Sequence, residues 1–553
     1  MTEYKAGARA APIHAMPVPD LLKAAAAKFP RAPAMDFLGK RTNYAKLARL
    51  VDAAAAGFQR LGVKKGDRVA LCLPNTPYAV ICYYAILKTG GVVVNLSPLY
   101  VEREFRHFIQ DSGVSIAVTL DLAELYNKLA PVLGSCGLEK LIVCSLPDLL
   151  PLPKRLGFYL AKRRELANIP QDSRHVSFRT LIAPGGRPTP VACDPAHDLA
   201  VLQYTGGTTG IPKAAMLTHA NLTANCEQVA RLVPELQPAS GSMLVLVPLF
   251  HVFAMTVAMN LSVRFAFNMV LLPRYDKELL RNTLRRTKPL MFPGVPTIYA
   301  AINEAAAKEK WDLSSIRYCL SGAAPLPAEV QHRFEKLSGC SLVEGYGLTE
   351  ASPVVSVNPF GQLREGSIGI PLPGTQVEIR STEDPSRILP PGEKGEVCIR
   401  GPQVMLGYWN RPDETAKVFI DGALRTGDVG YIDADGYIFL VDRIKDVIIS
   451  GGYNVYPRIV EEALYQHHAV AEAAVIGVPD ARRGQVPKAF VKLREGEELS
   501  EAELHAYLAG MLSPIERPRF IEFRDYLPKT AVGKLSKKEL IAEQAAAHRE
   551  AAE

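Results

Sequence analysis

Short apolar segments alternate with helical segments through the first 400 residues of this 553-residue chain. Apolar residues recur at helical spacing over 47–61. The apolar segments 68–73 and 92–95 have the length of strands, and a helical pattern over 78–89 lies between them. The pattern recurs at 104–119 and around 285–320. Strands that are apolar on both faces and are joined by helices are typical of a parallel sheet covered by helices. We therefore expect an α/β fold with mainly parallel sheets.

The rest of the chain has a different pattern. Glycine and proline separate short strand-like segments over 365–442, which indicates antiparallel β structure. A compact α+β unit is expected after residue 443, with strands at 473–478, 489–493 and 520–523, a helix near 501–512 and a helical tail from 539. At roughly 150 residues per domain the length allows three or four units. We place a boundary at about 443–446.

Composition narrows the class of protein. The net charge of +7 is small for this length and gives no argument for nucleic acid as a partner. The nine cysteines include no C-x-x-C pair, so we expect neither a disulfide framework nor a zinc site. The start has no apolar signal segment, no segment of about 18 apolar residues could span a membrane, and the last residues, AAE, form no peroxisomal address. A cytoplasmic protein is expected.

Residues 149–166, LLPLPKRLGFYLAKRREL, carry five basic residues among leucine, phenylalanine and tyrosine. Such a segment can be a surface helix that touches anionic membrane. It can also be an ordinary amphipathic helix with its apolar side over a core, and we favour this second interpretation because the pattern is common on globular domains.

The segment from Tyr204 to Lys213, YTGGTTGIPK, follows the apolar strand LAVLQ. Its glycines let the backbone turn N–H groups toward an anion, its threonines add hydroxyl donors and its lysine adds a positive charge. The spacing differs from that of a Walker A loop, G-x-x-x-x-G-K-[ST]. We interpret the segment as a polyphosphate cradle.

Three further groups can complete a nucleotide site. In EGYGLTE, from Glu344 to Glu350, an aromatic ring between glycines suits a flat base, and the threonine and carboxylate suit phosphate and magnesium; a plain turn between strands is the alternative. Asp428 and Arg443 can hold ribose hydroxyls or form a surface ion pair. Lys534 in PKTAVGKLSK can reach a neighbouring cleft or be an ordinary exposed lysine.

Taken together, these motifs resemble the adenylate-forming family, which includes acyl-CoA synthetases, aryl-CoA ligases, luciferases and the adenylation domains of peptide synthetases. The resemblance covers about residues 20–540 and is carried by YTGGTTGIPK, PLFHVFA, SGAAPL, EGYGLTE, DGALRTGDVGYIDADGYIFLVDRIKD, SGGYNVYP and PKTAVGKLSK. Within the family the chain is most similar to bacterial long-chain fatty acyl-CoA synthetases, through the run from Asp421 to Asp446, LQYTGGTTG, NVYP and GPQVMLGYWNRPDET.

The resemblance implies a fold and an activity. The fold is a large N-terminal domain, residues 1–443, made of two α/β subdomains with mainly parallel sheets and a distorted β-barrel. A hinge at 444–446 joins it to a small mobile α+β domain, residues 447–553. The implied activity uses ATP and Mg²⁺ to convert a long-chain fatty acid into an acyl adenylate and then transfers the acyl group to CoA, with no nucleic acid as partner.

The resemblance also implies the role of each matching residue. Those that hold the ATP phosphates are Thr205, Gly206, Gly207, Thr208, Thr209, Gly210 and Lys213. Those that frame the adenine and acyl pocket are Gly322, Ala323, Ala324, Glu344, Gly345, Tyr346 and Gly347. Thr349 contacts phosphate, and Glu350 ligates magnesium together with Thr205. Asp428 and Arg443 hold the ribose. His251 lies beside the acyl carboxylate, and Lys534 binds that carboxylate and the α-phosphate. Lys445 is at the hinge, and Gly451 and Gly452 line the thiol tunnel.

Two positions depart from the commonest family pattern. Ala214 stands where glycine usually follows the lysine, and its methyl group could narrow the approach of the backbone to phosphate. Lys445 replaces an aspartate at the hinge, a variant that the family also uses.

Several alternatives stay open at this point. The substrate could be a medium-chain or aryl acid, since the small residues around Gly322 and Gly345 could border a long channel or only pack closely. A peptide-synthetase module is disfavoured by His251, where such modules carry an aspartate, and by the 19 residues after Lys534, which are too few for a carrier domain. SGGYNVYP argues against an acyl-AMP ligase that never uses CoA, and the full set of motifs argues against a non-enzymatic membrane adaptor. Peripheral membrane contact and a homodimer are left open.

Overall fold

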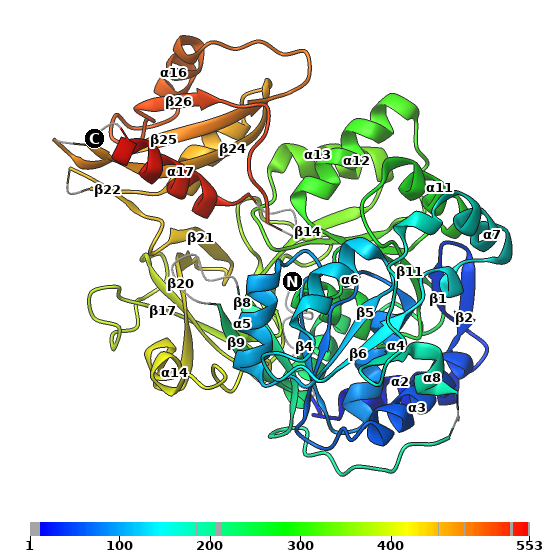
Figure 1. Cartoon of the computed structure of the whole chain (residues 1–553). Coiled ribbons are helices and arrows are strands. Elements are labelled where there is room, and N and C mark those ends of the chain that lie inside the picture. Colours follow the sequence, from blue (N-terminus) through cyan, green and yellow to red (C-terminus); the bar gives the residue numbers. More distant parts are fainter. Residues whose placement is uncertain are drawn as a thin grey trace.

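The computed structural model describes residues 12–183, 186–205, 212–451, 453–480, 482–530 and 535–550. Four sheets organise this part of the chain (Figure 1). Two large ones form the body of the N-terminal region, a third is an antiparallel sheet beside them, and the fourth belongs to a small C-terminal domain, drawn in orange and red.

The first large sheet has seven strands in the order β7-β6-β5-β3-β4-β8-β9. All neighbours are parallel except β8 and β9, which form an antiparallel pair. The strands are β3 Arg68–Leu71, β4 Val92–Asn95, β5 Ile116–Leu120, β6 Lys140–Cys144, β7 His175–Ser177, β8 Leu199–Thr205 and β9 Lys213–Thr218. The predicted strands at 68–73 and 92–95 are confirmed, because four of the central strands are apolar and almost wholly buried.

The second large sheet has nine strands in the order β16-β15-β14-β13-β12-β10-β11-β1-β2, parallel from β14 to β1 and antiparallel at both ends. Its strands are β1 Pro33–Phe37, β2 Lys40–Asn43, β10 Ser242–Val245, β11 Asn268–Leu271, β12 Met291–Gly294, β13 Tyr318–Ser321, β14 Ser341–Gly347, β15 Val354–Val357 and β16 Ile370–Pro371.

Helices between the two sheets make one continuous apolar core. They include α2 Val18–Lys28, α3 Tyr44–Arg60, α4 Pro77–Lys88, α9 His219–Ala230, the π-helix η4 Ala254–Asn260 and α10 Leu261–Arg264. Every residue of α4 except the last is buried, as expected of a helix that is apolar all round. Outer helices include α5 Glu102–Ser112, α6 Ala123–Leu129, α8 Phe178–Ile182, α11 Lys277–Thr287, α12 Pro296–Glu309 and α13 Ala328–Ser338.

The predicted antiparallel region is confirmed. It comprises β17 Gln376–Arg380, β18 Gly395–Arg400, β19 Phe419–Ile420, β20 Ala423–Ile432 and β21 Ile438–Arg443, with the short helix α14 Pro412–Val418 beside them. All of its strand pairs are antiparallel. The figure shows this region in yellow, beneath the small domain (Figure 1).

The small domain has a sheet of β23-β22-β25-β24, with β26 paired to β25. Its elements are β22 Ile448–Ser450, β23 Tyr453–Val455, α15 Pro457–Tyr465, β24 Val470–Asp480, β25 Gly484–Leu493, α16 Glu501–Ala509, β26 Phe520–Phe523 and α17 Lys537–Glu550. The strands predicted around 473–478, 489–493 and 520–523 are all present. The expected α/β class, with a large N-terminal and a small C-terminal domain, is therefore confirmed. The hinge at 444–446 and the mobility of the small domain stay predictions.

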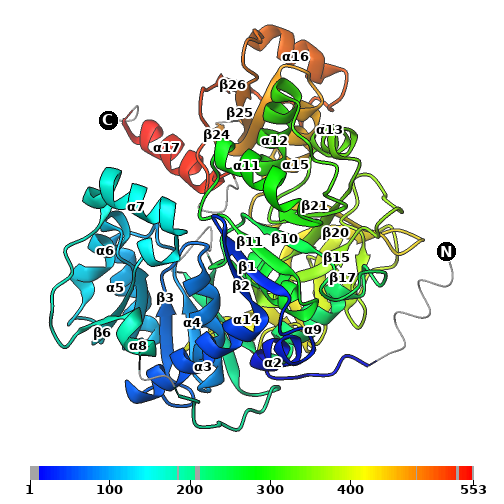
Figure 2. The ribbon, with the colours of Figure 1, turned by 90° about the vertical axis from the view of Figure 1, so that its right-hand side faces the viewer.

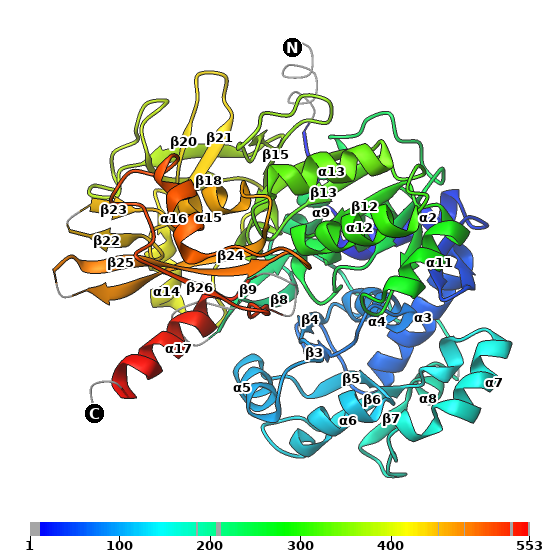
Figure 3. The ribbon, with the colours of Figure 1, turned by 90° about the horizontal axis from the view of Figure 1, so that it is seen from above.

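Ion pairs join the small domain to the α12–α13 side of the large one (Figure 2). Arg494 at the end of β25 pairs with Glu329 of α13 at 2.6 Å, and Glu495 pairs with Lys308 of α12 at 3.1 Å. Viewed from above, β24 of the small domain lies between the antiparallel region and the helices α12 and α13 (Figure 3). Because Arg458 N–H of α15 also donates to Asp442 of β21 at 2.8 Å, the small domain contacts two parts of the large one.

The segment 149–166 forms a helix, α7 Leu152–Ala161, at the periphery of the large domain (Figures 1 and 3). Leu149 and Leu150 before the helix and Phe158 within it are buried in the apolar core, as expected, but the leucines of the helix itself are exposed, so the expectation that its apolar side lies over a core is only partly correct. Within the described ranges, none of the helices has the length and apolarity needed to cross a membrane.

Candidate active site

The predicted phosphate cradle lies in the sequence between β8 and β9. Thr205 ends β8, Lys213 begins β9, and the two residues are paired across the antiparallel ladder. The cradle residues between them, Gly206, Gly207, Thr208, Thr209 and Gly210, lie outside the described residues. Ala214 is 1% exposed and belongs to an apolar cluster that also contains Tyr204. Its methyl group therefore has a packing role, which explains why alanine is accepted there.

Lys213 is held by side chains from a distant segment. Its Nζ lies 2.5 Å from Oε2 of Glu414 in α14 and 5.1 Å from the centre of the Tyr408 ring. The hydrogen bond from Lys213, assisted by one from Lys417, lowers the pKa of Glu414 to about 2. Glu414 therefore stays ionised. Its carboxylate pairs with the Lys213 ammonium in the way that a bound phosphate would.

Glu350 lies in a short 3-10 helix, η5 Thr349–Ala351, which also carries Thr349. Tyr408 donates a hydrogen bond from its hydroxyl to Oε1 of Glu350 at 2.7 Å, and Met405 N–H donates to the Glu350 carbonyl at 2.8 Å. Burial, followed by the charge of Glu350, raises the pKa of Tyr408. Tyr408 therefore contacts both predicted phosphate-site residues, Lys213 and Glu350.

Asp428 and Arg443 are directly opposite each other on β20 and β21. Arg443 donates from Nε to Oδ1 of Asp428 at 2.9 Å, and the Tyr346 hydroxyl donates to Oδ2 at 2.5 Å. The carboxylate of Asp428 raises the pKa of Arg443. The structure thus joins the predicted ribose pair to the aromatic residue of the EGYGLTE motif.

The small residues of SGAAPL and EGYGLTE pack closely. A Cβ atom at Gly322 would lie 3.2 Å from the Phe253 ring, one at Gly345 would lie 2.8 Å from Leu320, and one at Gly347 would lie 2.0 Å from the Pro353 carbonyl oxygen. Ala323 adopts a φ of +70°, and Ala324 is half-buried. Close packing accounts for the three glycines, so their small size by itself is no sign of a channel.

Glu344 lies beside Ser321 in the sheet and faces the small domain. Burial raises the pKa of Glu344 to about 7, while the charge of Arg458 in α15 acts in the opposite direction. Arg458 N–H also donates to Oδ2 of Asp442 at 2.8 Å. The first turn of α15 is thereby held against the end of β21 and beside the predicted adenine pocket.

The hinge residue Lys445 lies in the same charged environment. Burial lowers the pKa of Lys445, and the charge of Arg443 does so too, while Asp428 and Glu350 act in the opposite direction. Gly451 follows β22 with a φ of +59°, and its N–H donates to the Arg483 carbonyl at 2.8 Å. Gly452 and Lys534 lie outside the described residues.

His251 lies directly before the first turn that leads into η4, the π-helix Ala254–Asn260. Its N–H donates to the Pro248 carbonyl at 3.0 Å, and its own carbonyl accepts from Met255 N–H at 3.0 Å. π-Helices are rare and are often found at functional sites. Phe253, two residues further on, is the side chain that covers Gly322.

Comparison with known proteins assigns the chain to a family. The family model of the AMP-binding enzyme matches residues 22–409, and that of the AMP-binding enzyme C-terminal domain matches residues 459–534. The chain belongs to the AMP-binding enzyme family. The predicted adenylate-forming family is thereby confirmed.

Individual relatives cover nearly the whole chain. It is 43% identical over 544 residues to a long-chain-fatty-acid–CoA ligase of Bacillus subtilis, which covers 97% of each chain. It is 37% identical to a feruloyl-CoA synthase of Amycolatopsis sp, over 92% of this chain and 96% of that one. Its fold is similar to the crystal structure of the anthranilate CoA ligase AuaEII in complex with anthranoyl-AMP, with a TM-score of 0.86, 27% identity, and coverage of 98% and 99%.

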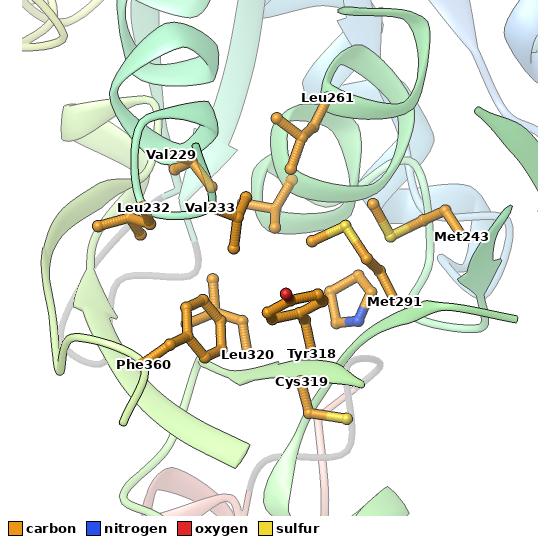
Figure 4. Close-up of a pocket in the computed structure, with 12 residues that line it drawn as sticks. Val229, Leu232, Val233, Met243, Leu261, Met291, Tyr318, Cys319, Leu320 and Phe360 are labelled. Atoms are coloured by element: carbon orange, nitrogen blue, oxygen red, sulfur yellow. The ribbon is translucent and has the colours of Figure 1, made fainter. Parts of the chain in front are cut away.

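An apolar cavity lies beside β13, the strand that leads into SGAAPL, in this AMP-binding enzyme (Figure 4). Val229 of α9 and Val233, which follows that helix, border one side, Tyr318 of β13 and Phe360 the other, and Met243 with Met291 closes a third side. The space left between these side chains is about 20 Å³, which is roughly the room that one water molecule needs. The cavity is thus apolar and almost filled by its own lining.

Tyr408, Glu414 and Arg458 were missed as site residues by the sequence analysis. Tyr408 and Glu414 occur in the run GPQVMLGYWNRPDET, which supported the family resemblance but was assigned no role. Arg458 directly follows NVYP. The run itself was the available signal for the first two, whereas nothing in the sequence links Arg458 to Glu344.

Proposed function

We propose that this protein activates a long-chain fatty acid with ATP and transfers the acyl group to CoA, giving acyl-CoA, AMP and pyrophosphate. The observation that carries the proposal is the 43% identity to the Bacillus subtilis long-chain-fatty-acid–CoA ligase over 97% of both chains. The geometry is compatible with it, since cationic, carboxylate and aromatic side chains suited to a nucleotide contact one another in two groups, one around Tyr408 and one around Asp428.

The reaction has two steps. A carboxylate is a poor acyl donor because its leaving group would be an oxide ion. In the first step a carboxylate oxygen of the acid bonds to the α-phosphorus of ATP, and the bond from that phosphorus to pyrophosphate breaks. In the second, the sulfur of the CoA thiolate bonds to the acyl carbon and AMP leaves with the oxygen it shared. Neither step needs a covalent nucleophile from the protein, so its task is positioning and charge stabilisation.

In this proposal Thr205 to Gly210, Lys213 and Thr349 hold the phosphates. Mg²⁺ would be held by Glu350, with Thr205 nearby, and would neutralise phosphate charge. Mg²⁺ is usually bound in proteins through one or two carboxylates and the phosphates of a substrate. Glu350 fits this mode because its carboxylate is half-buried, and among the described residues there is no cluster of three acidic, histidine or cysteine ligands.

The nucleoside would lie against the second group of residues. Asp428 and Arg443, already fixed to each other and to Tyr346, offer hydrogen bonds to the ribose hydroxyls. Gly322 to Ala324 and Glu344 to Gly347 would frame the adenine. His251 would stand beside the acyl carboxylate.

The acyl chain would extend into the apolar cavity. Its present volume is too small for a long chain, so its side chains must move. Met243 and Met291 suit this because methionine is unbranched and flexible.

Rotation of the small domain about Lys445 would separate the two steps. Lys534 would bind the carboxylate and the α-phosphate during the first step, and Gly451 and Gly452 would line the path of the thiol during the second. We expect Lys534→Ala to abolish formation of the acyl adenylate but to spare the reaction of supplied acyl adenylate with CoA. Single-turnover assays of each half-reaction measure this, and equal losses in both would contradict the role.

An aryl or medium-chain acid is the second candidate substrate. The 37% identity to the feruloyl-CoA synthase over nearly the whole chain favours keeping the aryl option. The lining of the cavity is aliphatic, methionine and aromatic, which suits either substrate.

The test is pyrophosphate release from Mg-ATP with palmitate, decanoate or coumarate, each with and without CoA. Highest kcat/KM with palmitate, and acyl-CoA formed only when CoA is present, supports the proposal. Release with coumarate alone shifts the substrate to aryl acids. If none of the three acids causes release of pyrophosphate, the proposed activity is contradicted.

We also propose a cytoplasmic location, a role in lipid metabolism, peripheral contact with membranes and a homodimer. The membrane contact is reasonable because long-chain fatty acids partition into bilayers. Sedimentation equilibrium of the purified protein tests the dimer.

A further inference from the structure

Helix α7, Leu152–Ala161, presents leucine side chains to solvent. Leu152 is 74% exposed, Leu156 is 65% exposed and Leu160 is 89% exposed, and Tyr159 beside them is exposed as well. Scattered exposed leucines are normal on a protein surface, but three on a single short helix are not scattered. They form one apolar surface, which we call the α7 face.

The α7 face is continuous because of helical periodicity. At 3.6 residues per turn, positions 152, 156, 159 and 160 fall within an arc of about 100°. Phe158, the buried residue of the helix, points away from this arc by roughly a third of a turn or more. The helix therefore attaches to the domain by one side and exposes the apolar residues of another.

Polar contacts fix the helix in this orientation. Lys154 donates from Nζ to the Leu38 carbonyl at 2.8 Å, and Arg155 pairs with Asp148 at 3.0 Å. Both contacts tie α7 to neighbouring segments of the large domain. The exposure of the α7 face therefore results from the way in which the helix is anchored.

Cations border the α7 face. Residues 152–164 include five basic side chains and no acidic one. Arg163 and Arg164, directly after the helix, are exposed, and the structure records no ion pair for either among the described residues. Tyr159, Leu160 and these two arginines line one hollow in the surface. Apolar groups beside unpaired arginines match the chemistry of an anionic bilayer surface, where acyl chains lie beneath phosphate groups.

We propose that the α7 face and the adjoining Arg163 and Arg164 form the surface by which this protein docks on a lipid bilayer that contains anionic headgroups. Leu156 and Leu160 enter the boundary between headgroups and acyl chains, and the two guanidinium groups contact lipid phosphates. The inference rests on the peripheral membrane contact proposed above, and it names the surface responsible. It does not depend on the ligase reaction, because α7 contributes no residue to the candidate active site.

Vesicle flotation of the full chain tests this. The vesicles contain phosphatidylcholine alone, or phosphatidylcholine with about a third phosphatidylglycerol. We expect the bound fraction to be at least tenfold higher with the anionic vesicles and to fall as salt is added, since exposed charges are screened. The double variants Leu156→Glu/Leu160→Glu and Arg163→Glu/Arg164→Glu should each lose at least tenfold. The matched control Ile388→Gln, which changes a side chain that is 55% exposed on the antiparallel region, should bind like the unaltered protein.

Four results decide the proposal. Failure of the unaltered protein to float overturns it, and so does flotation of both double variants at the unaltered level. If Ile388→Gln binds the vesicles as weakly as the α7 variants do, the assignment of the docking surface to α7 is wrong. If α7 substitutions convert a dimer to a monomer and leave flotation unchanged, the face binds a second copy and the proposal is wrong.

Two parallel measurements keep these results interpretable. Thermal unfolding shows whether a variant is folded, and the arginine variant retains the test if the leucine variant is not. Decanoate-dependent pyrophosphate release without vesicles reads the proposed reaction separately, so that loss of docking and absence of ligase activity are distinguishable.

Discussion

At the scale of single residues, the candidate phosphate site is already occupied by the protein's own charges. Glu414 pairs with Lys213, and Tyr408 donates to Glu350 while its ring faces Lys213. Each contact neutralises or orients a group that the proposed reaction needs for ATP. Binding of ATP must therefore compete with Glu414 for the lysine, while Tyr408 can hold the lysine in position throughout.

Replacing Glu414 tests that competition. We expect Glu414→Gln to lower the Kd of ATP by about threefold, because the amide no longer competes with phosphate for Lys213; the effect is modest since both groups are about a third exposed. Isothermal titration with ATP measures it. Asp413→Asn removes the same charge one residue away and should leave the Kd unchanged. Weaker ATP binding by Glu414→Gln would mean that the carboxylate positions the lysine.

A buried histidine determines part of the way in which the free energy of unfolding falls at acid pH. His219 accepts a hydrogen bond from Val18 N–H at Nδ1, and burial lowers its pKa from 6.5 to about 4. Because the folded pKa is below the unfolded one, its contribution is complete above pH 6.5 and is lost as the pH falls toward 4. The free energy of unfolding should drop by about 2 kcal/mol between pH 7.5 and 5 through this group.

Urea denaturation at several pH values measures this drop. His219→Gln keeps an acceptor for Val18 but does not titrate, so its stability should depend less on pH in this window. An identical pH dependence in the variant would assign the acid sensitivity to other groups.

At the scale of elements, local sequence patterns predicted what local physics determines. The strands β3 and β4 are short apolar runs, and α4 is apolar all round, so their type and burial follow from composition and period. The strand that precedes the predicted cradle, β8, was recognised from its apolar run, whereas β9 was not predicted. These signals act over a few residues and need no knowledge of the rest of the chain.

The pairings within the site could not be predicted in this way. Lys213 and Glu414 are 201 residues apart, and Glu350 and Tyr408 are 58 apart. Such contacts depend on how whole sheets and helices are placed. The spacing of apolar residues along the chain carries no information about that placement. The spacing of apolar residues also does not show what covers an apolar helix face, which is why the exposed interpretation of α7 was not the favoured one.

The turn after β14 gives an element-scale prediction. Gly347 approaches the Pro353 carbonyl so closely that an added Cβ would lie 2.0 Å from its oxygen, and Leu348 N–H bonds to the same oxygen at 3.0 Å. Gly347→Ala should therefore displace the turn that carries Thr349 and Glu350 and cost about 2 kcal/mol of stability or more.

Urea midpoints measure the cost at Gly347. Gly157→Ala in α7 is the control: nothing lies within 4 Å of its added methyl group, so it should stabilise by about 0.5–1 kcal/mol through helix propensity. A neutral Gly347→Ala would show that the turn can relax without loss.

At the scale of the whole molecule, the arrangement of the two domains is held mainly by charges. Arg458 lies at Glu344, Arg494 pairs with Glu329, and Glu495 pairs with Lys308. The Arg494–Glu329 and Glu495–Lys308 pairs are partly or largely exposed, and such pairs are individually weak and screened by salt. Domains joined by such contacts can separate and dock again, as the proposed rotation about Lys445 requires.

Charge reversal at one pair tests this view. In the unaltered protein Arg494 lies 2.6 Å from Glu329. Glu329→Arg and Arg494→Glu each put two like charges at this contact, so each should reduce docking of the small domain. Arg443 in the connecting segment is a site for trypsin and is half-buried in the docked arrangement. Trypsin should therefore cut there about threefold faster in each single variant, since cleavage follows the population of the open form.

The double variant restores opposite charges and should return to the original rate. If the single variants are cut no faster, or if the double variant is cut as fast as they are, this pair does not hold the domains together, and the proposed hinge must be controlled by the Arg458 contact instead.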